Sequence, residues 1–430
     1  MSYNSQLEHL IEELGGCGLM QKLICIIMHS SNIVTVWSML ATSFIGYNPG
    51  FECHILDATV SSLSVLNLSE LSTNQLCSVG PNATCSAYAF HDKMNTAVSE
   101  WKLVCDRRWI VAFITSTQMV GVLVGSIVSG QMADSAGRKP AMLTGVTAMV
   151  LFNFIGYFTQ SWQIYSAVRF FIGVGVGFSF TVLFTQMVEF VPSPWRPFVV
   201  SFPSDPLVSM LYALVSWWLH DWKRIHLLKT LIGVFILTIL YFVPESFRWL
   251  ISKKKFERAE GSISFLATVN RVPKPDLKEL FDTAATEINT SSNATTVYTV
   301  VTLWTSKDLR NVTLSLSILW FAMCTTWYCM SLGMESISVD IYLTILLINL
   351  VDLPAYSVTG PLVNRSVGFG FQSTVGKLGA VTAPLLIHLD GRIPGLMYFT
   401  CGILLFLSTG SIVRLKETKG LKLSDSLSDT

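Results

Sequence analysis

Ten long apolar stretches are the feature of this 430-residue sequence that most limits how the chain can fold. An α-helix needs roughly 20 mostly apolar residues to cross the hydrocarbon core of a bilayer, and each stretch is close to that length. The pattern therefore predicts an all-α integral membrane protein with about ten transmembrane helices, embedded in the lipid bilayer. We expect these helices at residues 23–45, 110–130, 141–158, 164–190, 198–219, 226–243, 312–330, 339–362, 367–388 and 395–415.

The charge content supports a membrane protein and argues against other classes. Charged residues make up 13% of the chain, whereas soluble proteins average about 25%. The net charge is +1 and the sequence has no basic stripe interleaved with aromatic residues, so we expect no nucleic-acid partner. The histidines lack metal-binding spacing and no phosphate-binding loop occurs. We therefore expect neither an enzyme nor a bound metal or cofactor.

Two polar segments divide the chain and set its expected orientation. Residues 244–310 carry ten Lys or Arg, whereas residues 47–108 carry only four. Because positive residues concentrate on the cytosolic side, we expect the linker 244–311 and both termini in the cytosol, and the loop 46–108 outside the cell. The prediction is a multi-pass plasma-membrane protein with a six-helix part (residues 1–243) and a four-helix part (residues 312–430).

The loop 46–108 has the composition of an extracellular segment. Four cysteines in a polar loop favour two disulfides in an oxidising compartment, with three possible pairings. Two N-x-S/T sequons in the same loop predict N-glycosylation. The cysteines are Cys53, Cys77, Cys85 and Cys105, and the sequon asparagines are Asn67 and Asn82.

A charged motif, G-Q-M-A-D-S-A-G-R-K-P at residues 130–140, lies between the second and third apolar stretches. Gly130 and Gly137 permit tight turns and close backbone approach. Asp134 suits a helix N-terminus, and Arg138 can bridge to acids on neighbouring helices. One interpretation is a positively charged anchor joined to a turn. The spacing G-x-x-x-D-x-x-G-R-K is more specific, and it resembles the cytosolic gate motif of the major facilitator superfamily.

Four further motifs resemble the organic cation, anion and carnitine transporter family of that superfamily. They are P-E-S-F-R-W-L at 244–250, S-E-W-K-L-V-C-D at 99–106, F-I-G-Y-N-P at 44–49 and E-T-K-G at 417–420. Phe247 replaces the family's second proline, and Lys416 stands where a proline is usual. The resemblance covers nearly the whole chain. It implies the major facilitator fold and a secondary carrier of small organic ions that works by alternating access.

The resembled family has twelve transmembrane helices, two more than the ten stretches found here. Residues 360–365 begin a second copy of the gate motif and run directly into residues 366–370, which look like the start of the family's eleventh span. The resemblance therefore implies that the ninth and tenth spans are absent. The chain is then a carrier despite this loss, or a transport-inactive truncated isoform that acts by association, or the product of an incomplete gene model.

Charged residues near the expected cytosolic face form a candidate gate. In the resembled family such networks hold the outward-open state and break when the two halves rock. A switch needs states only a few kcal/mol apart, and exposed ion pairs contribute roughly 0–1 kcal/mol each, so several modest pairs suit it. The candidate gating residues are Gly130, Asp134, Gly137, Arg138, Glu189, Arg196, Glu245 and Arg248.

Ionisable and aromatic residues inside the stretches are candidates for substrate binding, because burying a charge in a membrane is costly. Lys377 lies near the middle of stretch 367–388, and in the resembled family a base at the matching place goes with anions or carnitine. We therefore favour an anionic or zwitterionic substrate over a cation. The alternative is that Lys377 neutralises Asp352. The candidate substrate-binding residues are Lys377, Asp352, Tyr356, Trp327, Tyr328 and His29.

Two further bases lie inside apolar stretches. Lys229 falls near one end of stretch 226–243, and we expect its long side chain to reach the membrane surface. Arg169 falls near the start of stretch 164–190, where it bridges helices or contacts substrate.

Overall fold

The computed structural model describes residues 3–54, 87–90, 94–293, 307–332, 341–362, 369–390 and 393–412. Within them, each of the ten predicted stretches coincides with a long helix or, in one case, with a pair of helices. The helices are α2 (Leu19–Ile45), α5 (Trp109–Ser135), α6 (Arg138–Tyr157), α7 (Trp162–Phe190), α8 (Arg196–Val200) with α9 (Ser204–Leu219), α10 (Trp222–Phe242), α14 (Lys307–Leu332), α15 (Ile341–Leu362), α16 (Phe369–Asp390) and α17 (Leu396–Ile412).

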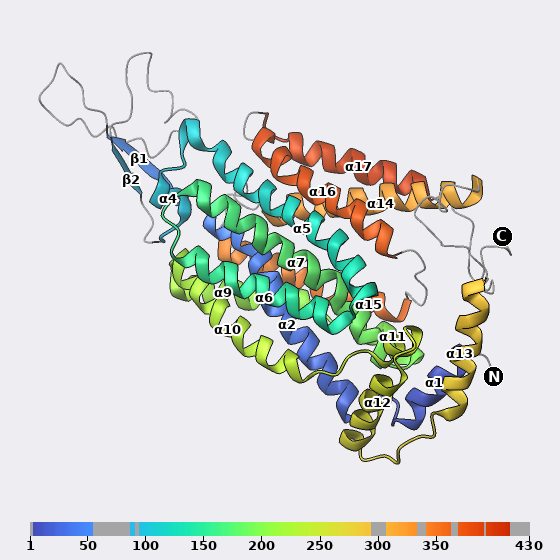
Figure 1. Cartoon of the computed structure of the whole chain (residues 1–430). Coiled ribbons are helices and arrows are strands. Elements are labelled where there is room, and N and C mark those ends of the chain that lie inside the picture. Colours follow the sequence, from blue (N-terminus) through green and yellow to red (C-terminus); the bar gives the residue numbers. More distant parts are fainter. Residues whose placement is uncertain are drawn as a thin grey trace, which may run out of the picture.

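The long helices run side by side in one bundle (Figure 1). Helix α16 packs on α5, and α15 packs on α9, so the helices after residue 307 are joined to those before residue 243 along two seams. In the described part of the chain, seven helical segments are long and apolar enough to cross a membrane, and α15 and α17 add shorter apolar stretches.

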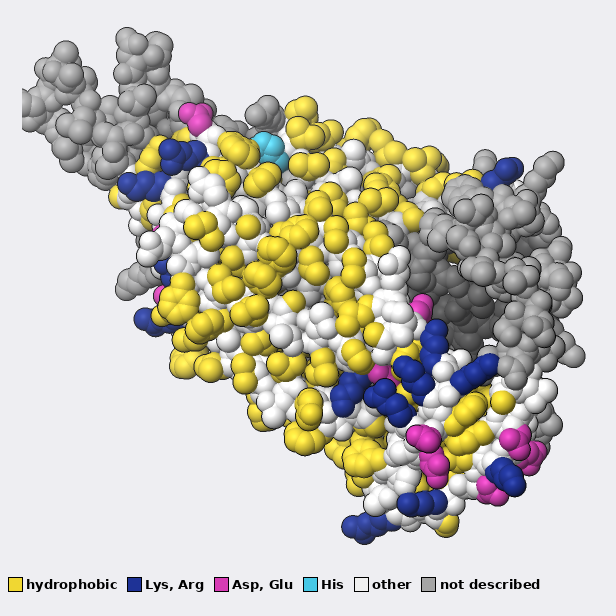
Figure 2. Space-filling view, in the orientation of Figure 1, with side chains coloured by type: hydrophobic (Ala, Val, Ile, Leu, Met, Phe, Trp, Pro, Cys, Tyr) yellow, Lys and Arg dark blue, Asp and Glu magenta, His cyan; other side chains and the backbone are white. Residues whose placement is uncertain are grey.

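An apolar belt covers the bundle. Large apolar side chains are exposed all along the long helices, including Trp218, Phe242 and Phe406. Figure 2 shows hydrophobic side chains across the middle of the visible face, with charged side chains gathered towards its two ends. Soluble proteins rarely expose apolar patches of this extent. The surface therefore agrees with a multi-pass protein surrounded by lipid.

Shorter elements lie at the two ends of the bundle (Figure 1). At one end, β1 and β2 form an antiparallel pair near α4, and at the other end α1 lies against α13 close to α11 and α12. Their bounds are β1 (Phe51–His54), β2 (Ala87–Phe90), α4 (Ala97–Trp101), η1 (Cys105–Arg107), η2 (Ser193–Trp195), α1 (Tyr3–Glu13), α11 (Phe247–Ser252), α12 (Phe256–Asn270) and α13 (Lys278–Asn293).

Close contact between α5 and α7 depends on glycines in both helices. A Cβ atom added at Gly121 would lie 2.1 Å from the carbonyl oxygen of Phe170, and one added at Gly173 would lie 2.2 Å from that of Gln118. Small residues let helix backbones approach closely in a membrane.

The expected fifth span is interrupted. A continuous helix at 198–219 was predicted, but the chain forms α8, leaves helical geometry at Ser201, and starts α9 at Ser204. The reason is Pro203, which has no N–H to donate and disfavours helical geometry in the residue before it.

The turn carrying the gate motif is also shorter than expected. Helix α5 continues to Ser135 and α6 starts at Arg138, which leaves only Ala136 and Gly137 between them. Gly130 therefore lies inside α5 rather than in a turn, and a Cβ there would meet open space. The expectation that Gly130 permits a turn or a close approach is wrong.

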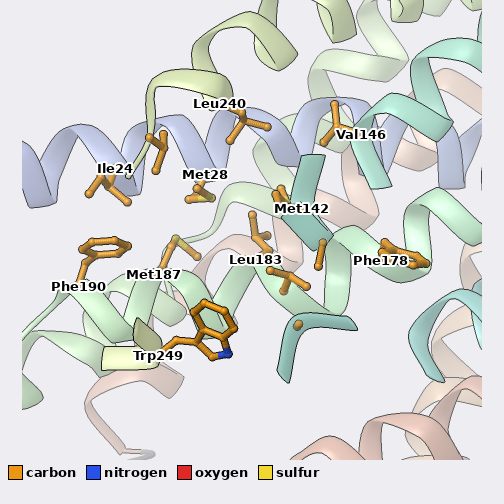
Figure 3. Close-up of a cluster of buried hydrophobic side chains, with 14 of the residues drawn as sticks. Ile24, Met28, Met142, Val146, Phe178, Leu183, Met187, Phe190, Leu240 and Trp249 are labelled. Atoms are coloured by element: carbon orange, nitrogen blue, oxygen red, sulfur yellow. The ribbon is translucent and has the colours of Figure 1, made fainter. Parts of the chain in front are cut away.

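A buried apolar cluster holds the gate motif in place. Figure 3 shows Ile24 of α2, Met142 of α6, Met187 of α7 and Leu240 of α10 in one buried cluster with Trp249 of α11. The motif P-E-S-F-R-W-L thus packs against the first helices of the bundle through its apolar residues, and its charged residues are held beside the α5–α6 turn.

Candidate functional site

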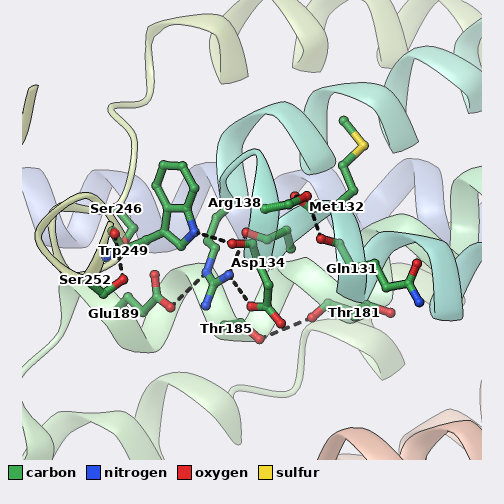
Figure 4. Close-up of polar contacts among 12 residues, drawn as sticks. Gln131, Met132, Asp134, Arg138, Thr181, Thr185, Glu189, Ser246, Trp249 and Ser252 are labelled. Atoms are coloured by element: carbon green, nitrogen blue, oxygen red, sulfur yellow. Dashed lines mark hydrogen bonds and ion pairs between the residues drawn. The ribbon is translucent and has the colours of Figure 1, made fainter. Parts of the chain in front are cut away.

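Arg138 is the centre of a charge cluster at the α5–α6 turn (Figure 4). Its guanidinium donates hydrogen bonds to Asp134 at 2.7 Å and to Glu189 of α7 at 3.0 Å. It also donates to the carbonyl oxygen of Ala133 at 2.7 Å. The Asp134 side chain is 77% exposed, whereas Arg138 and Glu189 are 14% and 15% exposed. Charge-assisted bonds between shielded partners are the stronger kind, so the link from Arg138 to Glu189 joins α6 firmly to α7.

Glu245 completes this group, which we call the Arg138 cluster (Asp134, Arg138, Glu189 and Glu245). One carboxylate oxygen of Glu245 accepts hydrogen bonds from the backbone N–H groups of Arg138 at 3.0 Å and Lys139 at 3.1 Å. The same oxygen accepts from the N–H of Ser246 at 3.0 Å. The first N–H groups of a helix lack partners inside the helix and carry partial positive charge. Glu245 therefore caps α6 and ties it to the chain that enters α11.

Gly137 makes this cap possible. Its φ is +121°, which L side chains rarely adopt, and an added Cβ would lie 2.2 Å from Glu245 Oε2 and 3.3 Å from the Trp249 ring. The Trp249 indole also donates a hydrogen bond to the carbonyl oxygen of Asp134 at 3.1 Å. Both the backbone conformation and the space at position 137 thus require glycine.

A second charge cluster surrounds Glu8 of α1, a residue that sequence reasoning did not single out. The Glu8 carboxylate accepts hydrogen bonds from Arg196 and Arg248, each at 2.6 Å, and from the backbone N–H of Ser193 at 3.1 Å. Arg196 also donates to the carbonyl oxygens at the end of α7, Val188 and Val191. This Glu8 cluster (Glu8, Arg196 and Arg248) fastens α1 beneath α8 and α11.

Seven of the eight predicted gating residues therefore fall into two groups rather than one network. Asp134, Arg138, Glu189 and Glu245 come together, supported by Gly137. Arg196 and Arg248 meet at Glu8 instead. Gly130 belongs to neither group, because it lies one helical turn before Asp134 with open space around it. The hydrogen-bond partners named in these two clusters all lie in α1 or in the segment from α5 to α11.

The ion pairs of Glu8 give the first prediction. Burial raises the pKa of Glu8, but the bonds from Arg248 and the Ser193 N–H, and the charges of Arg248 and Arg196, outweigh it and lower the pKa to about 2. A carboxyl group whose pKa is lower in the folded protein than in the unfolded protein stabilises the fold at pH values above its unfolded pKa, which is near 4.5 here. This stabilisation is lost as the pH falls towards the folded pKa of about 2. We expect Glu8→Gln to lower the melting temperature at pH 7, and the gap to wild type to shrink progressively below pH 4.5.

Melting curves of wild type and Glu8→Gln between pH 7 and pH 3, in detergent, measure this effect. Glu12→Gln is the matched control, because Glu12 is exposed on the same helix. A gap between wild type and Glu8→Gln that stays constant down to pH 3 would contradict the assigned ion pairs.

Lys377 lies on α16, which packs on α14 and α5. Its ammonium is 4.9 Å from the centroid of the Phe180 ring of α7. The ionisable groups that interact with it electrostatically are the side chain of Cys324 in α14 and the carboxylate of Asp205 in α9, and the described residues include no direct ion pair to it. Among the described residues, Asp352 of α15 has no interaction with Lys377. The structure thus places Asp205, rather than Asp352, near the predicted substrate lysine.

Asp205 is held in a polar group between α2 and α9. The amide of Asn32 and the hydroxyl of Ser204 donate hydrogen bonds to its carboxylate. His29, one turn before Asn32, lies 3.1 Å from the Ser204 hydroxyl. Sequence reasoning proposed His29 but missed Asp205, although an ionisable residue inside an apolar stretch is the signal that identified Lys377 and Asp352.

The aromatic candidates differ in their surroundings. Tyr328 of α14 is buried and interacts electrostatically with Asp205, which places it beside the same polar group. Trp327 is 46% exposed and points away from the interior, although its ring touches that of Tyr328 with centroids 4.8 Å apart. The Tyr356 side chain lies outside the described part.

The outer-loop predictions fall almost entirely outside the described residues. Cys77, Cys85, Asn67 and Asn82 lie there, and so does the side chain of Cys53. Cys105 is disulfide-bonded, and the pairing that was left open cannot be assigned within the described part.

Comparison with solved structures defines the class of protein. The chain is similar to the xylose transporter XylE from E. coli in its inward-open conformation, with a TM-score of 0.55, 15% identity, and coverage of 94% of this chain and 98% of that chain. A partially occluded inward-open form of XylE gives a TM-score of 0.53 over 93% of this chain and 99% of that chain. XylE belongs to the major facilitator superfamily. The chain therefore has the all-α major facilitator fold.

Sequence comparison then gives the family. The family model described as Sugar (and other) transporter matches residues 78–336, and the chain belongs to this family. It is a membrane transporter and not an enzyme.

The chain also resembles solute carriers, some of which are named as organic cation transporters. It is 25% identical to solute carrier family 22 member 4 of Mus musculus, over 81% of this chain and 69% of that protein. It is 28% identical to an organic cation transporter protein of Drosophila melanogaster, over 85% and 71%. It is 23% identical to organic cation/carnitine transporter 2 of Homo sapiens, over 96% and 92%. These relatives confirm the family resemblance that the motifs indicated.

Proposed function

We propose that this protein is a secondary carrier of small organic anions or zwitterions, with anions and zwitterions favoured over cations. The observation that carries the proposal is Lys377, a base in the bundle interior next to an aromatic ring and within electrostatic reach of Asp205. A base in such a low-dielectric environment attracts a carboxylate or sulfate strongly. The ring of Phe180 beside it supplies an apolar surface for the organic part of the substrate.

Asp205 refines the choice between an anion and a zwitterion. Its carboxylate repels a simple anion that approaches Lys377, but it attracts a substrate ammonium. A zwitterion with a few bonds between its charges places its carboxylate at Lys377 and its cationic group at Asp205. The printed name of the human relative includes carnitine, which is a zwitterion of this kind. Both observations favour a zwitterion over a plain anion.

The charge clusters suit the alternating-access cycle of such carriers. In this proposal, the part before residue 243 and the part after residue 312 rock around the Lys377 region. The protein lies in the plasma membrane, and both termini lie in the cytosol. Glu245 and Arg138 keep the α5–α6 turn rigid, so that it can close against the second part. The pair between Arg138 and the exposed Asp134 is modest in strength, which lets this contact break and re-form during the cycle.

The proposal is tested by an uptake screen in cells that express the chain. Labelled probes of three kinds are compared: an organic anion, an organic cation and carnitine. We expect saturable uptake of carnitine, weaker uptake of the anion, and uptake of the cation no higher than in cells with empty vector. Uptake of the cation alone would overturn the assignment of Lys377 as the substrate-binding base.

A second candidate function, a transport-inactive truncated form that acts by association, is favoured by one observation. The alignment with the human relative is 518 positions long, whereas this chain has 430 residues, so at least 88 positions of that relative have no counterpart here. Two absent transmembrane helices, at roughly 20 residues each, would account for about half of these positions. Sequencing the transcript around residues 364–366 decides whether two further spans are encoded. If they are, the shorter chain is an incomplete gene model and the carrier function belongs to the longer one.

A further inference from the structure

The S-E-W-K-L-V-C-D motif belongs to a segment, residues 94–105, which we call the outer strap. The strap includes α4 and lies at the end of the bundle that carries β1 and β2 (Figure 1). It ends at Cys105, which is disulfide-bonded. Disulfides form in oxidising compartments, so this end of the bundle is the one that we expect outside the cell.

Hydrogen bonds and an ion pair hold the outer strap on the turn between α9 and α10. The backbone of Asn95 donates a hydrogen bond to the carbonyl oxygen of His220 at 2.9 Å and accepts one from the N–H of Trp222 at 3.2 Å. The Glu100 carboxylate accepts hydrogen bonds from the Lys223 ammonium at 2.5 Å and from the Trp222 indole at 3.0 Å. The strap is therefore fixed to the part of the chain before residue 243.

The surface beneath the strap is itself tied together. The Trp101 ring packs against the rings of Tyr165 in α7 and Trp222 in α10, with centroids 5.4 and 5.3 Å away. The Tyr165 hydroxyl is bonded to one ring nitrogen of His226 at 3.0 Å. The other ring nitrogen is bonded to the side-chain oxygen of Asn153 in α6 at 2.9 Å. These buried bonds join α6, α7 and α10, so the strap rests on a rigid support.

The two bases expected inside apolar stretches lie in the same region, and both are fully buried. The Arg169 guanidinium is 6.0 Å from the centroid of the Tyr165 ring and interacts electrostatically with Tyr212, so it connects α7 with α9. Lys229 belongs to the stripe of buried residues that recurs every three or four positions on α10 and faces the bundle. The prediction that Lys229 reaches the membrane surface is therefore wrong.

The first turn of α15 packs against the outer strap and α2. Ile341 and Ile345 are 4% and 0% exposed, in the same buried cluster as Met94 of the strap. Tyr342 donates a hydrogen bond from its hydroxyl to the sulfur of Met94 at 3.1 Å. The ring of Tyr342 lies 5.5 Å from that of Phe44 in α2, measured between centroids. The strap, α2 and the part of the chain after residue 312 therefore meet at Tyr342.

The buried cluster around Tyr342 separates the outer end of the bundle from the polar group of Asp205. Asp205 lies in the first turn of α9, and Val208 and Tyr212 follow about one and two turns later as members of this cluster. The helix then ends at His220, beneath the strap. Because α15 packs along α9, its first turns cover the way from the outer end to the substrate site.

We propose that Tyr342 is a positioning residue of the transport cycle, which latches α15 to the outer strap and so closes the outer side of the substrate site. The proposal rests on the alternating-access cycle of the proposed function. A thioether sulfur is a weak acceptor, so the bond to Met94 can break and re-form as the cycle requires. The strap stays in place, since its disulfide and its bonds to the α9–α10 turn hold it, and α15 moves away from α9.

Labelling of Cys324 from outside the cell tests the latch. Cys324 of α14 interacts electrostatically with Lys377, and its sulfur would lie 2.7 Å from a Cβ added at Gly376, so it reports access to the substrate site. Intact cells that express the full chain are treated with a membrane-impermeant methanethiosulfonate, and the labelled fraction of each cysteine is measured by mass spectrometry. Cys329, 0% exposed on the same helix, is the internal control for general loosening of the bundle.

We expect Tyr342→Phe, which loses only the hydroxyl, to raise the rate of Cys324 labelling about threefold, and Tyr342→Ser to raise it about tenfold. Cys329 should stay unlabelled in both variants. Tyr241→Phe, which removes a hydroxyl near the end of α10 that lies away from the strap, is the matched control and should label like wild type. Unchanged labelling of Cys324 in both Tyr342 variants, or an equal rise at Cys329, would overturn the proposal.

Met94→Leu separates the strap from the ring contact, because leucine has a similar size but no sulfur. If the bond between Met94 and Tyr342 forms the latch, the double variant with Tyr342→Phe labels at the same rate as either single variant. Rate increases that multiply in the double variant would remove the strap from the latch. Labelling needs no substrate, so raised labelling without any uptake would contradict the proposed carrier function and leave the latch standing.

Discussion

Replacing Lys377 by alanine is expected to lower the uptake of labelled carnitine by about 100-fold, with the protein still present in the membrane. The reason is that the Lys377 ammonium lies beside the Phe180 ring and within electrostatic reach of Asp205. Truncating one side of a desolvated charge pair costs about 2–5 kcal/mol, and a tenfold change corresponds to about 1.4 kcal/mol. Losing this attraction therefore lowers uptake by between one and several powers of ten, and 100-fold lies within that range.

Two companion variants separate substrate binding from packing. Lys377→Arg keeps the charge and is expected to retain part of the uptake. Asp352→Asn removes the acid that the sequence offered as a partner but that has no interaction with Lys377 in the structure. This variant should stay within about twofold of wild type if Lys377 acts on the substrate. Uptake in Lys377→Ala at the wild-type level would remove this residue from the mechanism, and a large loss in Asp352→Asn would restore the pairing with Asp352.

Asp205→Asn tells an anion carrier from a zwitterion carrier. If Asp205 holds the cationic group of a zwitterion, the variant loses carnitine uptake but keeps or gains uptake of a plain anion. The hydrogen bonds from Asn32 and Ser204 can be kept by the new amide oxygen, so the fold is not expected to suffer. Surface biotinylation provides the measure of how much protein reaches the membrane.

The sequence predicted the helices well because lipid leaves few choices. A run of about 20 apolar residues in a bilayer must satisfy its own backbone, and a helix does so. All ten runs accordingly formed helices. The break at Pro203 was missed because the prediction counted apolar residues only and did not consider that proline lacks the backbone N–H that a helix needs. Helix α1 was missed because it is not apolar enough to cross a membrane and lies against α13 at one end of the bundle.

The site residues were predicted less completely, because pairing depends on distance in space. Arg138 and Asp134 are four residues apart, so their contact can be read from helical spacing. Glu8 contacts Arg248 across 240 positions, and no local pattern joins them. Asp205 could have been found, since it carries the same signal as Lys377. The burial of Lys229 could also have been found from the three-and-four spacing of apolar residues on α10.

Replacing Gly137 by alanine is expected to destabilise the protein by about 3 kcal/mol or more and to abolish transport. The φ of +121° with ψ near extended values lies in a region that is essentially restricted to glycine, and a side chain there costs about 1–3 kcal/mol. In addition, the new Cβ would lie 2.2 Å from Glu245 Oε2, so the carboxylate must move away from the N–H groups of Arg138 and Lys139. The cap on α6 would be lost with it.

Gly130→Ala is the matched control, since it places the same methyl group seven residues earlier in the same motif. Gly130 lies within α5 and an added Cβ meets open space. Alanine in a helix interior is more stable than glycine by roughly 0.5–1 kcal/mol, so this variant should melt at or slightly above the wild-type temperature. If both glycine variants lose stability equally, the motif depends on small residues in general and not on the conformation of Gly137.

The double variant Gly137→Ala with Glu245→Ala separates the two causes. Removing the Glu245 carboxylate relieves the contact with the new Cβ but leaves the backbone strain at position 137. If the contact dominates, the double variant melts no lower than Glu245→Ala alone. If the strain dominates, the two losses add, because each then acts on a different part of the turn. Either result fixes how the α5–α6 turn is held. A Gly137→Ala protein that melts and transports like wild type would show that the cap by Glu245 is not needed for the cycle.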